Sequence, residues 1–259
     1  METLRERWMR SGVREGDILL IHSNIGRTIV DYSRTSGARI GPEEVLESFI
    51  EAVGPSGTLL FPLFNFEFTQ GAPFDIRSTP SHMGAITELA RKYQGSVRTG
   101  HPIYSFCALG RHSHHFKNVC NKNAYSEDSP FGILKRLGGK IAVLDLPDSK
   151  SMTFYHHVEE VMRVQYRYFK DFTGEYIDEN GNSSQRTHNI YVRDLLKGAV
   201  SNSDPAGELL WRAGLYIGCR PQIDTGLRTI SAKSMYDFVA DLITNGDAEG
   251  NLFIYRNKT

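Results

Sequence analysis

The chain has 259 residues, 40% of them hydrophobic and 23% charged, a composition typical of a soluble globular protein with a sizeable core. Thirty basic residues balance thirty acidic ones, so net charge indicates neither a nucleic-acid nor a membrane partner. No run approaches the roughly 18 apolar residues of a membrane span, and the charged N-terminus has no signal-peptide core. Three scattered cysteines, Cys107, Cys120 and Cys219, favour a reducing compartment, so we expect a cytoplasmic enzyme.

The first half of the chain alternates predicted helices and buried strands. Residues 3–11 have the spacing of a short amphipathic helix, and residues 17–22 form an apolar run bounded by turn residues, which predicts a strand. Residues 42–53 begin with proline and are followed by Gly54, which is typical of the two ends of a helix. The next predicted elements are a strand at 57–64, a helix at 83–93 and a strand at 103–109.

The second half continues this alternation around a different segment. A short helix at 131–137, a strand at 140–145 and a helix at 151–160 are predicted in that order. Residues 165–190 predict a hairpin-like insertion, because an alternating segment is followed by a tight turn near 178–184. Two further strands, at 214–218 and 226–230, precede a helix at 231–243 that a serine caps. We expect one α/β domain, residues 1–259, with helices on both faces of its sheet.

The helix at 151–160 carries the residues with the clearest chemical meaning. His156 and Glu159 are three positions apart, so their side chains meet on one helix face. A carboxylate beside an imidazole fixes its tautomer and raises its basicity, as a general base requires. The alternative is a surface helix with an ordinary His–Glu pair, which the spacing alone leaves open.

Six motifs, in chain order, carry a resemblance to a known family. They are a strand ending in His22 and Ser23, a Val-Gly-Pro-Ser-Gly-Thr-Leu turn at 53–59, Pro-Phe-Asp with Thr-Pro-Ser at 73–81, Arg-Thr-Gly-His-Pro at 98–102 with Ser105, Ser-Pro through Gly-Gly at 129–139, and Thr-Phe-Tyr-His-His-Val-Glu at 153–159. Together they resemble the aminoglycoside 3-N-acetyltransferase family. The matches are good over residues 16–160 and loose beyond.

The resemblance implies a three-layer α/β/α sandwich around a mixed sheet. It also implies acetyl-coenzyme A as acyl donor, the amine of an aminoglycoside or related amino sugar as acceptor, and no metal. His156 would be the general base for direct attack, oriented by Glu159. Thr153 is either a donor to the developing oxyanion or a simple helix cap. Cys107 lies in an apolar run, where a thiol is inert, so covalent catalysis is disfavoured.

The resemblance also assigns residues to coenzyme A. Arg98 and Thr99 match a loop that contacts its phosphates, and Ser105 is a further polar candidate in the same groove. The segment expected along the pantetheine arm consists of His22, Ser23, Asn24 and Ile25. The expected partners are coenzyme A and a small amine, with neither nucleic acid nor membrane, and a homodimer is compatible with the sequence.

The acceptor is less well defined than the donor. Glu67, Asp75 and Asn65 are expected on the acceptor side, in a region rich in phenylalanine. A pocket for a polycationic drug needs many carboxylates, yet this chain is neutral, with a pI near 7.1. Asp145 also stands where the family usually has glycine. The sequence leaves two acceptors open: an aminoglycoside antibiotic, or an amino sugar of a biosynthetic pathway, such as an amino sugar linked to a nucleotide.

Two hypotheses from other functional classes are also compatible with the sequence. A catalytically silent protein that binds coenzyme A or a sugar would keep the scaffold, although the intact dyad speaks against it. A metal hydrolase would use His112, His114 and His115, but these histidines have no clear carboxylate partner in the sequence.

Overall fold

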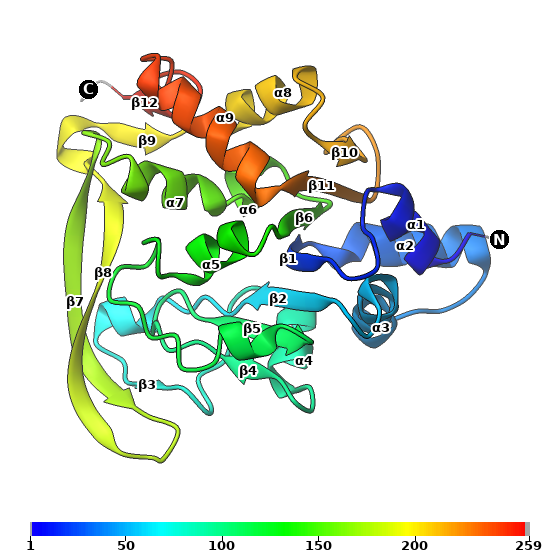
Figure 1. Cartoon of the computed structure of the whole chain (residues 1–259), viewed down its shortest axis with the longest axis horizontal. Coiled ribbons are helices and arrows are strands. Elements are labelled where there is room, and N and C mark those ends of the chain that lie inside the picture. Colours follow the sequence, from blue (N-terminus) through cyan, green and yellow to red (C-terminus); the bar gives the residue numbers. More distant parts are fainter. Residues whose placement is uncertain (1, 257–259) are drawn as a thin grey trace.

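A seven-stranded mixed sheet forms the centre of the computed structural model, which describes residues 2–256 (Figure 1). Strand β1 pairs in parallel with β2 and β6, whereas the outer strands pair antiparallel. The strand order is β10 (Ile217–Gly218), β11 (Leu227–Ser231), β6 (Lys140–Leu144), β1 (Ile18–Ser23), β2 (Thr58–Pro62), β5 (Phe106–Gly110) and β4 (Val97–Arg98).

Helices cover both faces of this sheet, because successive side chains of a strand point to opposite sides. Leu19 of β1 belongs to one buried cluster and Leu20 to the other. The first cluster is covered by α1 (Leu4–Arg10), α2 (Ile25–Ser36), α3 (Pro42–Val53) and α4 (Ala85–Lys92). The second is covered by α5 (Pro130–Arg136), α7 (Phe154–Val161), α8 (Asp204–Arg212) and α9 (Ala232–Thr244). The expected α/β/α sandwich around a mixed sheet is confirmed.

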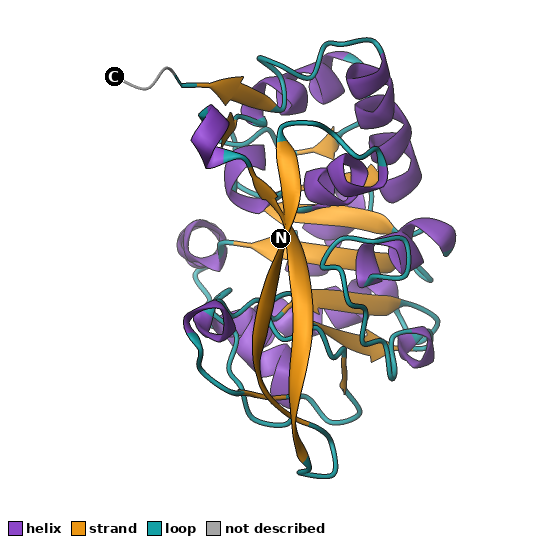
Figure 2. Ribbon diagram, turned by 90° about the vertical axis from the view of Figure 1, so that its left-hand side faces the viewer, coloured by secondary structure: helices purple, strands orange, loops and turns teal. Residues whose placement is uncertain are grey.

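A long hairpin crosses the end of the molecule, as Figure 2 shows. Its strands are β7 (Arg167–Ile177) and β8 (Ser183–Arg193), which confirms the insertion expected around 165–190. The short strand β3 (Phe74–Asp75) pairs with β7. The remaining elements are α6 (Asp148–Ser151), β9 (Ala199–Ser201), β12 (Phe253–Tyr255) and three 3₁₀ turns, η1 (Glu67–Gln70), η2 (Ser113–His115) and η3 (Leu195–Lys197).

The structure departs from the sequence expectations at three places in its helices. The segment after β1 is helix α2, which Asn24 caps at its start and Gly37 ends in a left-handed conformation (φ 72°). The helix expected at 151–160 is interrupted at Met152, whose ψ of 64° leaves the helical region, so α6 and α7 are separate. Helix α8 was also not expected.

The strand expected from residue 103 begins three residues later. The backbone amides of Ile103 and Tyr104 donate to Nδ1 of His101, at 3.3 and 3.0 Å, so they do not join the sheet there. None of the helices in residues 2–256 is long and apolar enough to cross a lipid bilayer.

Candidate active site

His156 and Glu159 meet as their spacing predicts, on helix α7. Nδ1 of His156 lies 2.8 Å from Oε2 of Glu159. The Glu159 side chain is 1% exposed, whereas that of His156 is 27% exposed. The carboxylate is therefore enclosed behind the imidazole, and the ring carries the exposed edge of the pair.

Two residues from the start of the hairpin complete the surroundings of Glu159. Nε of Arg167 lies 2.8 Å from Oε2, and the hydroxyl of Tyr166 donates to Oε1 at 3.0 Å. The guanidinium also donates to the carbonyl of Tyr191 at 3.0 Å and to the hydroxyl of Ser201 at 3.3 Å. The buried carboxylate thus has a cation and two further partners, which is the condition for keeping it charged.

This arrangement determines the protonation state of the dyad. Burial alone would raise the pKa of Glu159, but Arg167 and the hydrogen bonds to the carboxylate outweigh it and lower that pKa. Burial and the positive charge of Arg167 lower the pKa of His156, so the ring is neutral at pH 7. Nδ1 lies 2.8 Å from the Glu159 carboxylate and 2.9 Å from Nη2 of Arg167, whereas Nε2 has no hydrogen-bond partner among the described residues.

His156 lines a cavity of about 380 Å³, here called the dyad cavity. Strands β8 and β9 form one wall, and the segment from α6 to α7 forms the opposite one. Its polar and aromatic lining includes Tyr104, Tyr125, Asp148, Lys150, Ser151, Thr153, Arg167, Tyr191, Arg193, Ser201 and Ser203. A neutral imidazole with an unpaired nitrogen therefore borders a space large enough for a sugar-sized ligand.

A second cavity, of about 460 Å³, lies where strand β1 ends and is called the strand-end cavity. His22, Ser23, Asn24 and Ile25 line it together, as the sequence predicts for a common binding segment. The remaining lining comes from Pro62, His82, Met83, Gly84, Ala85, Ile86, Thr87 and Leu146, and from Lys150 and Ser151.

The strand-end cavity has the features of an anion site. It includes the N-termini of helices α2 and α4, and the first turn of α4 has no side-chain cap. Nε2 of His22 and Oγ of Ser23 are buried without a hydrogen-bond partner among the described residues. Burial lowers the pKa of His22 to about 3, so its ring is neutral.

Lys150 and Ser151, in α6, line both cavities, so this helix borders the two spaces. A buried network holds α6 in place. The Asp148 carboxylate accepts hydrogen bonds from the hydroxyls of Tyr155 and Tyr216, both at 2.7 Å, and from Arg228 at 2.8 Å. The network joins α6 to α7, to β11 and to the segment after α8, so the helix that borders both cavities has a rigid base.

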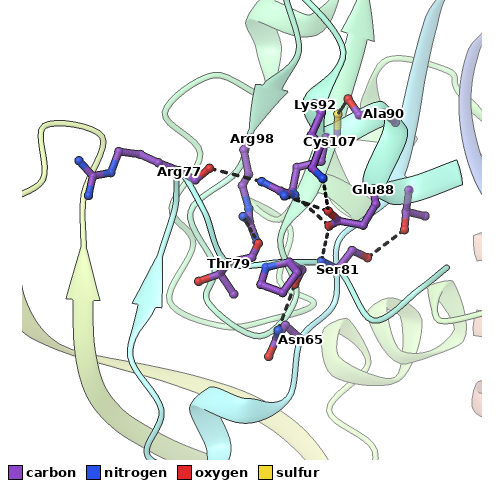
Figure 3. Close-up of polar contacts among 12 residues, drawn as sticks. Asn65, Arg77, Thr79, Ser81, Glu88, Ala90, Lys92, Arg98 and Cys107 are labelled. Atoms are coloured by element: carbon purple, nitrogen blue, oxygen red, sulfur yellow. Dashed lines mark hydrogen bonds and ion pairs between the residues drawn. The ribbon is translucent and has the colours of Figure 1, made fainter. Parts of the chain in front are cut away.

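The structure does not bring Arg98, Thr99 and Ser105 to the strand-end cavity. Arg98 donates to the carbonyl of Thr79 at 2.6 Å (Figure 3). It also donates to the hydroxyl of Ser105 at 3.1 Å. Burial lowers its pKa to about 10. Thr99 and Ser105 are fully buried, and Thr99 accepts from the amide of Phe106. These contacts hold neighbouring segments together, and they give no support to the expected contact with coenzyme A phosphates.

The three residues expected on the acceptor side also lie apart from His156. Asn65 is buried and donates to the carbonyl of Pro80 at 3.0 Å (Figure 3). Hydrogen bonding by Arg77, against the opposing effect of burial, lowers the pKa of Asp75 to about 2. Glu67 is exposed, 3.7 Å from His82. None of the three lines the dyad cavity.

Thr153 does line the dyad cavity. It occupies the N-cap position of α7, yet its side chain makes no capping hydrogen bond. His157 and Glu160 point away, toward the backbone of Tyr125. Cys107 is buried, and burial raises its pKa to about 12, so its thiol has no nucleophilic character at pH 7.

Several residues at the site were not singled out in the sequence. Arg167 and Arg193 belong to the hairpin strands, Tyr166 directly precedes β7, and Lys150 belongs to α6. The one available signal was an arginine near the start of the alternating segment predicted from residue 165. The rings of His112, His114 and His115 lie close together around η2. However, no group of three or more His, Cys, Asp or Glu side chains within residues 2–256 has an arrangement that could hold a metal ion.

Known proteins resemble this sequence over most of its length. The family model described as "Aminoglycoside 3-N-acetyltransferase" matches residues 30–244. Aminoglycoside N(3)-acetyltransferase VII of Streptomyces paromomycinus is 24% identical over 206 residues, which cover 71% of this chain and 68% of that protein. The aminoglycoside N(3')-acetyltransferase-like protein YokD of Bacillus subtilis is 27% identical over 222 residues, covering 70% of this chain and 79% of YokD.

Solved structures share the fold along nearly the whole chain. AAC-VIa with bound sisomicin superposes with a TM-score of 0.76 at 23% identity, covering 94% of this chain and 97% of that one. AAC-IIIb in a binary complex with coenzyme A superposes with a TM-score of 0.75 at 18% identity, covering 99% and 97%. From the family model and the common fold, we conclude that this chain is an acyltransferase-like member of the aminoglycoside 3-N-acetyltransferase family.

Proposed function

We propose that this protein transfers an acetyl group from acetyl-coenzyme A to the amine of an amino sugar, with His156 as general base. The observation that carries this proposal is the position of His156, which lines the dyad cavity, together with Lys150 and Ser151, which line both that cavity and the strand-end cavity. An acyl donor in one cavity and an amine in the other would meet beside the dyad.

The strand-end cavity suits coenzyme A in two respects. The N-termini of α2 and α4 present backbone N–H groups to an anion such as a phosphate. The unpaired Nε2 of His22 and Oγ of Ser23 provide polar contacts for the amide-bearing arm. The solved structure of AAC-IIIb with coenzyme A is a relative with this fold, which supports the same donor here.

The chemistry begins with the protonation state of the acceptor. A protonated amine has no lone pair, and the positive charges of Lys150, Arg167 and Arg193 around the dyad cavity favour its neutral form. His156 takes a proton on Nε2 as the nitrogen attacks, while Glu159 stabilises the imidazolium that forms. The new C–N bond replaces the C–S bond, and the imidazolium returns the proton to the departing thiolate.

Negative charge develops on the carbonyl oxygen during the attack and requires a donor. The hydroxyl of Thr153 is suitable, because it lines the dyad cavity and is not used as a helix cap. Acetyl-coenzyme A supplies the activated acyl group. The chain supplies orientation, the base and the oxyanion donor.

The test is release of free thiol from acetyl-coenzyme A in the presence of amino sugars, with and without the dyad. We expect His156→Ala to lower turnover by at least about 100-fold, the usual contribution of general base catalysis. Affinity for coenzyme A should stay within about twofold of the wild type, because His156 does not line the strand-end cavity.

The exposed histidine His114 offers a matched control, since His114→Ala removes an imidazole outside both cavities. Unchanged turnover in His156→Ala would exclude the dyad. Binding of coenzyme A without thiol release for any amine would instead indicate a catalytically silent binding protein.

A further inference from the structure

We propose that the amine acceptor of this protein carries an acidic group, a phosphate or a carboxylate, and is not a polycation. This inference rests on the proposed function, because it concerns the acceptor that the dyad cavity binds. It follows from the charges around that cavity, most of which are paired with one another.

Two cationic side chains that line the dyad cavity have no anionic partner among the described residues. Lys150 and Arg193 are exposed and form no ion pair or side-chain hydrogen bond within residues 2–256. By contrast, the guanidinium of Arg167 is paired with Glu159. The unpaired cations come from α6 and from the end of β8, that is, from the two walls of the cavity.

The one carboxylate that lines the dyad cavity is not available to a cation. Asp148 is 5% exposed, forms an ion pair with the buried Arg228 and accepts from two tyrosine hydroxyls. A protonated ligand would have to displace or share those partners. The dyad cavity therefore offers unpaired positive charge and no unpaired negative charge among the residues that the structure describes.

Carboxylates close to the rim are also engaged. Asp194, next to Arg193, pairs with Lys197 at 3.1 Å. Asp204 accepts hydrogen bonds from the amide and hydroxyl of Ser149, at 2.8 and 2.7 Å. Asp204 and Glu208 line a separate cavity that His156 does not border, and Glu208 pairs with Arg220.

The unpaired positive charges disfavour a drug with several ammonium groups. Two like charges about 4 Å apart repel one another, and the repulsion is stronger near a protein surface than in bulk water because the effective dielectric constant is lower there. Each ammonium group placed beside Lys150 or Arg193 meets this cost, and no free carboxylate in the cavity offsets it. A phosphate or carboxylate gains the same interaction with the opposite sign, and a guanidinium holds either one through two parallel hydrogen bonds.

The preference for an acidic acceptor is tested by measuring acceptor binding at a saturating concentration of coenzyme A. The free thiol carries no acyl group, so no transfer occurs during the measurement. Calorimetric titration would use four probes: glucosamine, glucosamine 6-phosphate, 2-amino-2-deoxyglucuronic acid and kanamycin. We expect at least one acidic probe to bind at least tenfold more tightly than glucosamine and than kanamycin. Which of the two acidic probes binds more tightly distinguishes phosphate from carboxylate.

Charge reversal locates the contact. Arg193→Glu and Lys150→Glu should each reduce the advantage of the acidic probe over glucosamine by at least tenfold. Arg111→Glu is the matched control, because Arg111 is exposed and lines neither cavity, and it should leave that advantage within twofold. Equal or tighter binding of kanamycin, or binding of neither acidic probe, would overturn the inference.

Thiol release measured in parallel separates this inference from the proposed function. Transfer to kanamycin alone that His156→Ala abolishes would leave the proposed function standing and refute the acidic acceptor. Preferential binding of an acidic probe, without thiol release that depends on His156, would support the acidic ligand and refute the transferase mechanism.

Discussion

Arg167 is paired with Glu159 through a contact of 2.8 Å between Nε and Oε2, and its Nη2 lies 2.9 Å from Nδ1 of His156. One cation, contributed by the hairpin, thus controls both members of the dyad. It keeps the carboxylate ionised, and it opposes a second proton on the ring. We infer that Arg167 positions the dyad and tunes its basicity without contacting the reacting atoms.

The role of Arg167 predicts a specific change in pH dependence. A base is active when unprotonated, so kcat/KM falls as pH drops through the pKa of His156, which burial and Arg167 hold below 6.5. Arg167→Gln removes the opposing charge, so the acidic limb of the profile should move upward by about one pH unit. Arg167→Lys keeps the charge, and its acidic limb should stay close to that of the wild type.

Steady-state kinetics between pH 5 and 8 give this comparison. A purely structural role of Arg167 would lower activity equally at every pH, and both variants would then behave alike. Such a result would contradict the tuning role.

Ser23→Ala should weaken acetyl-coenzyme A binding without destabilising the fold. Oγ of Ser23 is buried at the strand-end cavity and has no partner among the described residues, so no internal hydrogen bond is lost. We expect KM for acetyl-coenzyme A to rise by about 3- to 10-fold, the range for one hydrogen bond. Ser129→Ala is the matched control, because Oγ of Ser129 is also buried and unpaired but lies outside that cavity. Equal KM values for the two variants would refute this use of the strand-end cavity.

Arg98→Lys should reduce stability and leave KM for acetyl-coenzyme A within twofold. The guanidinium bridges the carbonyl of Thr79 and the hydroxyl of Ser105 and stacks on Phe74, contacts that an ammonium cannot make together. Loss of these buried contacts should cost about 1 to 3 kcal/mol in the free energy of unfolding. Urea unfolding and initial rates provide the two measurements. A tenfold higher KM at unchanged stability would instead indicate that Arg98 binds a phosphate of acetyl-coenzyme A.

Glu160 makes stability depend on pH. Burial raises the pKa of Glu160 to about 7, compared with 4.5 for an ordinary glutamate. The unfolded chain loses this proton more readily, so stability should fall as pH rises from about 4.5 to about 7 and level off above. Glu160→Gln carries no such proton, so its stability relative to the wild type should improve by about 3 kcal/mol between pH 5 and pH 8. Urea unfolding at both pH values, with the exposed Glu179→Gln as control, checks this. A constant difference would contradict it.

The sequence alone was sufficient to predict contacts between residues that are close together in the chain. His156 and Glu159 are three apart on a helix, so local geometry alone brings their side chains together. Residues 22–25 line one cavity because they lie together at the end of one buried strand, and their contact with coenzyme A stays a prediction. Helix α2 was not predicted, although Asn24 and Gly37 are residues typical of the two ends of a helix.

The partners that arrive from distant segments were not predictable. Arg167 reaches Glu159 only because the hairpin crosses the end of the sheet, a long-range arrangement that no local pattern encodes. Arg98 was assigned to coenzyme A from its motif, but its polar partners Thr79 and Ser105 lie in other segments, which only the folded chain brings to it. Asp145 adopts a left-handed φ of 54° and is held there by Thr28, 117 positions away in the sequence.

The proposed mechanism requires the donor and the acceptor to meet at Lys150 and Ser151, beside Nε2 of His156. A crystal structure with bound coenzyme A would show where the donor lies. We expect its phosphates near the N-termini of α2 and α4, and its sulfur between the two cavities, facing the imidazole. Coenzyme A bound with its sulfur away from His156, or in any other cavity, would refute this mechanism.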